Sequence, residues 1–106
     1  MSVRVVTDDD LQSIVLQHEF VIVKFYADWC GSCKLLAPVY RRLSTNPVYA
    51  DVVFLDLDAE VSPQSRKLVG VDNLPFFATF NKGALVEAGA TAKEDTVVAM
   101  LDRLVL

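Results

Sequence analysis

The chain has 106 residues, of which 53% are hydrophobic and 23% charged, and its formal net charge is −4. This length predicts one domain over residues 1–106, and the apolar content excludes a disordered chain because it suffices for a buried core. The acidic balance argues against nucleic acid or an anionic membrane as a partner, and no apolar run is long enough to span a bilayer.

The first part of the sequence predicts a strand, a helix and a second strand. Residues 3–6 read as a short strand, and Thr7 followed by Asp10 predicts the N-cap of a helix with apolar spacing over 11–15. Residues 20–27, FVIVKFYA, are nearly all β-branched or aromatic. Such a run is typical of a strand that is covered on both faces in a parallel sheet.

The middle of the sequence repeats this alternation. Residues 30–43 predict a second helix, which Pro38 should kink. Residues 52–57 predict the next strand, and a Ser-Pro pair opens a short helix over 62–70 that should stop at its final glycine.

The last part of the sequence predicts a hairpin and a helix. The runs 76–80 and 84–88 flank the turn signal NKG, and residues 94–106 carry an apolar stripe. The full order is β-α-β-α-β-α-β-β-α, in which right-handed crossovers give a parallel centre and the hairpin gives an antiparallel edge. We therefore predict an α/β fold with a central mixed sheet and helices on both faces.

Both cysteines lie in the stretch ADWCGSCK, at Cys30 and Cys33. Cys30 falls where the buried strand meets the next helix, and the free N–H groups of a helix N-terminus stabilise a thiolate. The thiolate is the attacking species in disulfide exchange, and Cys33 lies one turn on, close enough to attack a mixed disulfide. Gly31 keeps this turn open, and Trp29 either shields the pair or packs as an ordinary aromatic residue.

The same spacing also occurs in metal sites and in inert core pairs. A tetrahedral zinc site needs four ligands, but the sequence has no second cysteine pair, and its one histidine, His18, reads as a surface or helix-end residue. Gly31 and Ser32 between the cysteines favour an exposed turn over a core position. We therefore expect redox chemistry and no metal.

The stretch VKFYADWCGSCKLLAPVY resembles the active-site strand and helix of the thioredoxin family, whose usual motif is Trp-Cys-Gly-Pro-Cys-Lys. Pro38 matches the family's proline after the second cysteine, and Pro75 in NLPFFATF matches its cis-proline. Gly83 and Gly89 match its hairpin glycine and late glycine, so the likeness covers essentially the whole chain. The resemblance implies the thioredoxin fold.

The resemblance also implies that the chain reduces protein disulfides, with Cys30 as nucleophile and Cys33 as resolving thiol. A cis bond before Pro75 would offer the backbone of Leu74 to an incoming peptide. The substrate contacts implied are Trp29, Leu74, Pro75, Phe76 and Gly89. No bound cofactor is implied beyond the redox-active disulfide, because a separate thioredoxin reductase, coupled to NADPH in most of the family, supplies the electrons.

Three residues depart from the family's pattern. Ser32 replaces the proline between the cysteines, and Phe76 replaces a small hydroxyl residue. Lys24 stands where the family has a buried aspartate, six residues before the first cysteine. Lys24 either extends to water or pairs below the cysteines with a carboxylate, for which Asp56 is the expected partner.

These departures leave three functions open. The leading one is a protein disulfide reductase; the second is a more oxidising or isomerase-type oxidoreductase, because Ser32 restores a backbone N–H beside the sulfurs that proline lacks. The third is a non-catalytic adaptor, which the two cysteines argue against.

The acidic surface favours a monomer. The start, MSVRVVTDDD, lacks the apolar segment of a secretory signal, so we expect a cytoplasmic protein, with an organelle also open after removal of a presequence.

Overall fold

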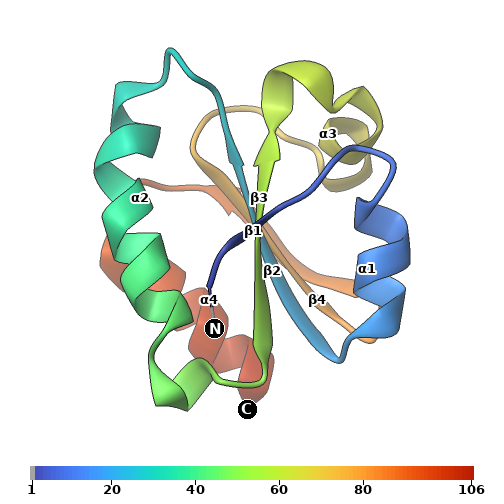
Figure 1. Cartoon of the computed structure of the whole chain (residues 1–106), viewed down its shortest axis with the longest axis vertical. Helices are drawn as coiled ribbons and strands as arrows, with labels where there is room; N and C mark the ends of the chain where they lie inside the picture. Colours follow the sequence, from blue (N-terminus) through green and yellow to red (C-terminus); the bar gives the residue numbers. More distant parts are fainter. Residues whose placement is uncertain (1) are drawn as a thin grey trace.

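A single five-stranded mixed sheet organises the chain in the computed structural model, which describes residues 2–106 (Figure 1). The strands, in sheet order, are β1 (Arg4–Val5), β3 (Val52–Asp58), β2 (Phe20–Tyr26), β4 (Phe76–Asn81) and β5 (Ala84–Ala90). The central strand β2 is parallel to β3 and antiparallel to β4, and β5 is antiparallel to β4. This arrangement confirms the predicted parallel centre with an antiparallel hairpin edge.

In the described part of the chain, four α-helices form the outer layers. They are α1 (Leu11–Gln17), α2 (Gly31–Ser44), α3 (Pro63–Val69) and α4 (Glu94–Val105). In Figure 1, α1 and α3 lie on one face of the sheet, and α2 and α4 lie on the other. The structure therefore confirms the predicted α/β fold with helices on both faces.

The buried run of β2 explains why both faces must be covered. Val21, Val23 and Phe25 pack into the core cluster that contains the apolar residues of α1, whereas Ile22 packs into the cluster of α2 and α4. Successive side chains of a strand alternate between the two faces. Lys24 therefore points to the same side as Ile22, toward α2.

The structure corrects several predicted boundaries. The N-cap of α1 is Asp10 rather than Thr7, and the Thr7 hydroxyl donates a hydrogen bond to the Asp10 carboxylate at 2.8 Å. The predicted strand 3–6 shortens to the two residues of β1. Cys30 lies before α2 as its N-cap, so the helix itself begins at Gly31.

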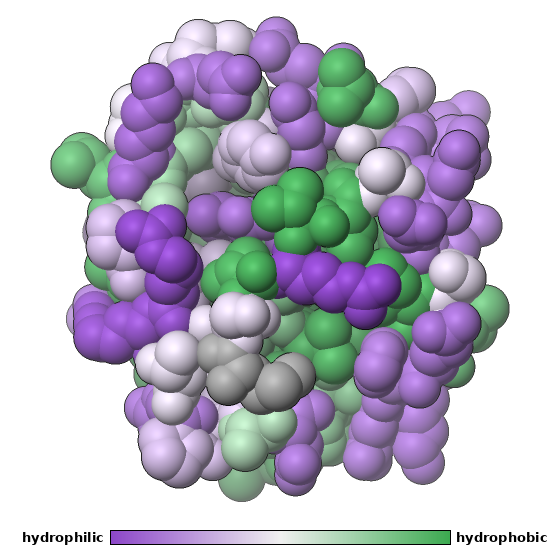
Figure 2. Space-filling model, viewed as in Figure 1, coloured by the Kyte–Doolittle hydropathy of each residue, from purple (hydrophilic) through white to green (hydrophobic). Residues whose placement is uncertain are grey.

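Figure 2 shows the face of the molecule on which the edge strand β1 lies. Hydrophobic side chains gather near the middle of this face, and hydrophilic ones border them. Val5 of β1 contributes to the exposed apolar surface of the protein. Within residues 2–106, no helix has both the length and the apolar character needed to cross a membrane.

Tyr40 of α2 joins its helix to β2 and β3 through hydrogen bonds. Its hydroxyl lies 3.1 Å from the carbonyl oxygen of Ile22 in β2 and 2.9 Å from that of Leu55 in β3, to which it donates. Its ring packs at an angle against Phe54 and Phe77, with ring centroids 5.3 and 5.6 Å apart. Tyr40 is 1% exposed, so water does not replace these contacts.

We expect Tyr40→Phe to lower the free energy of unfolding by about 1–2 kcal/mol, because buried carbonyl groups lose their hydroxyl donor. Chemical denaturation of the oxidised protein measures the change. Tyr26→Phe is the matched control, because the Tyr26 hydroxyl makes no hydrogen bond within residues 2–106. Equal losses in the two variants would show that the hydroxyl of Tyr40 has no special part in stability.

Candidate active site

Cys30 and Cys33 form a disulfide just beyond the carboxyl end of β2, with their Cα atoms 5.3 Å apart. Cys30 is the N-cap of α2, and its Sγ accepts a hydrogen bond from the backbone N–H of Cys33 at 3.2 Å. The sulfur thus takes the place of the oxygen that usually caps a helix. Because a helix N-terminus carries partial positive charge, this position favours negative charge on Cys30 once the disulfide is reduced.

Both cysteines are buried in this oxidised form. Cys30 is 5% exposed and Cys33 is 3% exposed, so neither residue is open to solvent while the disulfide is formed. The two sulfurs pack in a small cluster with Ala27, against which Tyr26 and Leu74 also lie. In this form the two sulfurs are distinguished by position rather than by exposure, because Cys30 caps the N-terminus of α2.

Ser32 contacts Cys30 through its side chain. Its Oγ lies 3.5 Å from the Sγ of Cys30, within hydrogen-bonding range for sulfur. The sequence had indicated the backbone N–H of Ser32 as the added donor. The structure instead provides two other groups at this sulfur, the Ser32 hydroxyl and the Cys33 amide.

The turn around the disulfide is open on its outer side. A side chain at Gly31 would meet no atom within 4 Å. Trp29 is 68% exposed, which excludes the alternative that it packs as an ordinary core aromatic. Its indole therefore belongs to the surface next to Cys30.

The proline segment lies across from the disulfide, and the Leu74–Pro75 bond is cis, as expected. Leu74 packs against the cluster that holds the two cysteines and Ala27. Its backbone N–H already donates to the side-chain oxygen of Asn73 at 2.9 Å, so a peptide that pairs with this group has to displace Asn73.

The structure contradicts the substrate contact assigned to Phe76. Its side chain is 3% exposed and packs edge-on against Phe25, with ring centroids 6.1 Å apart, in the core beneath the sheet. Gly89 does face open space, because a side chain there would meet no atom within 4 Å. Two residues farther on, the N–H of Thr91 donates to the carbonyl of Pro75 at 3.1 Å, which places this end of β5 beside the proline.

The structure places Lys24 inside the protein rather than in water. Lys24 is 3% exposed, and its Nζ lies 3.4 Å from Oδ1 of Asp56, the residue directly opposite on β3. The ammonium also lies 4.9 Å from the centre of the Tyr40 ring, within the range of a cation–π contact. The alternative in which Lys24 extends to solvent is therefore excluded.

The carboxylate of Asp56 is partly buried, and its pKa differs from that of an ordinary aspartate. Burial raises the pKa of Asp56 above its ordinary value, and the charges of Lys24 and Arg41 oppose this rise without cancelling it. Oδ1 is buried and accepts no hydrogen bond within residues 2–106, so its contact with Lys24 is a charge pair only. A surface cavity of about 300 Å³ is lined by Cys33, Lys24 and Asp56 together, so the second cysteine and this pair border the same space.

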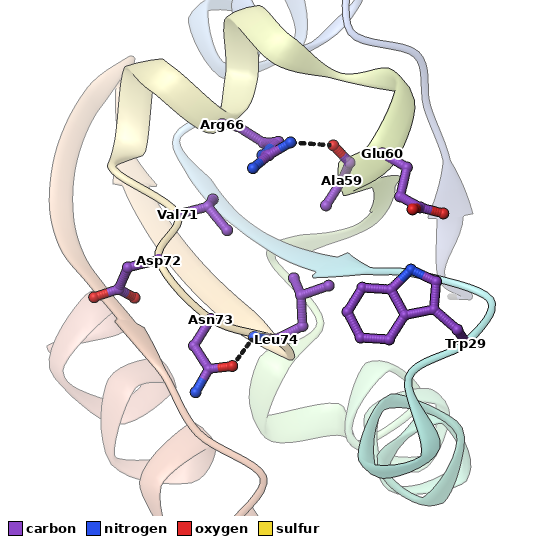
Figure 3. A pocket seen from close by; sticks show the side chains of 8 residues that line it. All are labelled: Trp29, Ala59, Glu60, Arg66, Val71, Asp72, Asn73 and Leu74. Atoms are coloured by element: carbon purple, nitrogen blue, oxygen red, sulfur yellow. Dashed lines mark hydrogen bonds between the residues drawn. The ribbon is translucent and has the colours of Figure 1, made fainter.

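A second hollow lies beside Trp29 (Figure 3), and the sequence pattern had not indicated it. Trp29 and Leu74 line it together with residues that follow β3, lie on α3 or precede the proline. These additional residues are Ala59, Glu60, Arg66, Val71, Asp72 and Asn73. The parallel pairing of β2 with β3 was the available signal, because it brings the carboxyl ends of both strands to one edge.

The surroundings of the two cysteines also bear on metal binding. Among residues 2–106, no three His, Cys, Asp or Glu side chains come together as a metal site would require. His18 lies at the carboxyl end of α1 as its C-cap. The chemistry that this geometry offers is thiol exchange at Cys30 with a titratable pair behind Cys33.

Comparison with known proteins supports this chemistry. Residues 2–103 match the family described as Thioredoxin. The chain is 32% identical over 102 residues to "Thioredoxin" of Chlamydia muridarum, covering 95% of this chain and 97% of that protein. It is also similar to the crystal structure of Malassezia sympodialis thioredoxin, with a TM-score of 0.90 at 25% identity, covering 100% and 96% of the two chains. A chain in the crystal structure of a complex of ferredoxin:thioredoxin reductase and thioredoxin f2 matches with a TM-score of 0.90 at 29% identity, covering 99% and 96%.

We expect Ser32→Ala to lower the reduction potential of the Cys30–Cys33 couple, because the reduced thiolate loses a hydroxyl donor while the backbone amide stays. A hydrogen bond of about 0.5–1.5 kcal/mol corresponds to roughly 10–30 mV for this two-electron couple. Ser32→Pro should lower the potential as well. Equilibration with glutathione or a dithiol buffer measures it, and Ser32→Thr, which keeps a hydroxyl, is the control. An unchanged potential in Ser32→Ala would contradict a role for the hydroxyl.

Proposed function

The chain belongs to the thioredoxin family and is a thiol–disulfide oxidoreductase that reduces protein disulfides, and we propose that Cys30 is its nucleophile and Cys33 its resolving thiol. One observation carries this assignment of roles. The Sγ of Cys30, and not that of Cys33, accepts the free N–H at the N-terminus of α2. Negative charge on Cys30 is therefore stabilised where attack on a substrate begins.

The reaction takes place in two exchanges. The Cys30 thiolate attacks one sulfur of the substrate disulfide, so that a mixed disulfide forms and the other substrate sulfur leaves as a thiolate. Deprotonated Cys33 then attacks the Sγ of Cys30, which forms the intramolecular disulfide and releases the second substrate thiolate. Two electrons pass to the substrate, whose two sulfurs take up two protons.

Asp56 is the group that accepts the proton of Cys33 before the second exchange. It shares a cavity with Cys33, and its raised pKa makes it a stronger base than an ordinary surface aspartate. Lys24 cannot take this proton while it carries its own. Its charge instead keeps Asp56 ionised in a partly buried position.

A separate thioredoxin reductase, coupled to NADPH, returns the protein to its dithiol form. A reductase of a different kind, ferredoxin:thioredoxin reductase, stands in complex with thioredoxin f2 in one of the similar solved structures, which supports a reductase as partner. The protein works as a cytoplasmic monomer. The acidic net charge of −4 supports solubility without association.

A more oxidising or isomerase-type activity is the second candidate. The Ser32 hydroxyl at 3.5 Å from the Cys30 sulfur favours it, because an additional donor stabilises the thiolate and hence the reduced form. A measured reduction potential separates the two candidates. A value close to thioredoxin's roughly −270 mV supports the reductase, and one nearer the roughly −180 mV of protein disulfide isomerase supports the isomerase.

We expect the protein to accelerate reduction of insulin disulfides by a dithiol, and Cys30→Ser to abolish this activity. Cys33→Ser should accumulate mixed disulfides with substrate, because the second exchange cannot occur, whereas Cys30→Ser should accumulate none. Non-reducing electrophoresis and mass spectrometry detect these species. Mixed disulfides in the Cys30→Ser variant, and none in Cys33→Ser, would reverse the two roles.

We expect Asp56→Asn to slow the second exchange at least tenfold near neutral pH, because a general base of this kind contributes roughly 10²–10⁴ to a rate. In the native protein the rate should fall as the pH drops through the raised pKa of Asp56, because protonation removes the base. Lys24→Met removes an opposing charge, raises that pKa further and should move the fall to higher pH.

Stopped-flow measurement of single-turnover resolution against pH gives these profiles. Asp58→Asn is the matched control, because Asp58 lies on the same strand but lines no part of this cavity, and asparagine keeps its cap on the Glu60 amide. If Asp56→Asn keeps both the native rate and the native profile, another group accepts the proton.

A further inference from the structure

We propose that the hollow shown in Figure 3 selects disulfide substrates with an acidic side chain close to the reactive cysteine, and that Arg66 binds this carboxylate. The proposal deepens the reductase function and rests on it. The occupant is an extended segment of a protein substrate.

The hollow is continuous with the disulfide. It has a volume of about 350 Å³, and Trp29 and Leu74 form its side nearest the cysteines. Leu74 also packs against the cluster of Ala27, Cys30 and Cys33, and Trp29 is the residue before Cys30. A substrate chain joined to Cys30 therefore passes over these two side chains and enters the hollow.

The lining changes from apolar to cationic along this path. Trp29, Leu74 and Val71 offer apolar surface beside the disulfide. Arg66 reaches into the hollow from α3, across from Trp29, and points toward Ala59 (Figure 3). A peptide segment that places an apolar side chain near Trp29 thus brings a following side chain to the guanidinium group.

The guanidinium of Arg66 keeps most of its hydrogen-bonding capacity. Its Nη1 lies 3.5 Å from the carbonyl oxygen of Ala59, a long contact that occupies one of five N–H donors. Within residues 2–106, no carboxylate oxygen lies within the 4.0 Å of an ion pair with Arg66. Arg42 and Arg103, by contrast, are paired with glutamates at 3.0 and 2.7 Å. An arginine with open donors in a groove suits a carboxylate, which it binds with two parallel hydrogen bonds.

Two acidic residues restrict where that carboxylate fits. Glu60 and Asp72 line the margins of the hollow, and Figure 3 shows their carboxylates turned away from Arg66. They repel a substrate acid that lies anywhere except over the guanidinium, and the net charge of −4 adds to this repulsion. The preference should therefore depend on position within the substrate rather than on its total charge.

A peptide series tests this positional preference. A short neutral peptide with one cysteine is joined through a disulfide to a neutral reporter thiol, and glutamate, glutamine or lysine is placed at each position flanking the cysteine. The rate constant for reduction is measured in single turnovers with the pre-reduced protein. At one position glutamate should react about twofold to fivefold faster than glutamine, the range of an exposed ion pair, and lysine should react more slowly. The advantage should shrink at high salt.

Arg66→Gln should remove this advantage, while Lys67→Gln should keep it. Lys67 is the matched control, because it is the next residue of α3, is also exposed and does not line the hollow. The proposal is overturned if glutamate gives no rate advantage at any position. It is also overturned if Arg66→Gln and Lys67→Gln reduce the advantage equally, because the preference would then come from the overall charge of the protein rather than from Arg66. In either case normal reduction of the neutral peptide leaves the reductase function intact. If the native protein reduces none of the peptides, the proposed function is wrong and this inference falls with it.

Discussion

The parallel pairing of β2 with β3 is the constraint on which the active site depends. It sets Lys24 opposite Asp56 and carries both strands to the same edge of the sheet, where the disulfide turn begins. Residues that follow the two strands therefore meet at this edge, although they are far apart in the sequence. The cavity behind Cys33 and the hollow beside Trp29 both arise from this one register.

Burial of the Lys24 ammonium in the central strand costs desolvation free energy, and two neighbouring groups stabilise the charge. Asp56 supplies an opposite charge at 3.4 Å, and the ring of Tyr40 lies 4.9 Å below the ammonium. The free energy needed to desolvate a buried ion pair can exceed the free energy gained from the attraction between its two charges. The position of the Lys24–Asp56 pair beside the cavity that Cys33 lines fits the proposed role in proton transfer.

The sequence predicted the neighbours of a site residue where strand pairing determines them. It did not predict them where helix docking or a side-chain rotation determines them. Alternation along two paired strands was enough to place Lys24 near Asp56. The same alternation sends Phe76, the first residue of β4, toward Phe25 in the core, which its closeness to Pro75 in the sequence had obscured. Arg66 and the hydroxyl of Ser32 depend on how a short helix docks and on a side-chain rotation, and local sequence patterns specify neither.

The sulfur cap of α2 ties the backbone to the redox state. The N–H of Cys33 donates to an atom whose charge changes during each catalytic cycle. A thiolate accepts this bond strongly, whereas a sulfur in a mixed disulfide accepts it weakly. Hydrogen exchange at the Cys33 amide should therefore be slower while Cys30 is a free thiolate than while it is bonded to another sulfur, so that protection of this amide reports the redox state of the site.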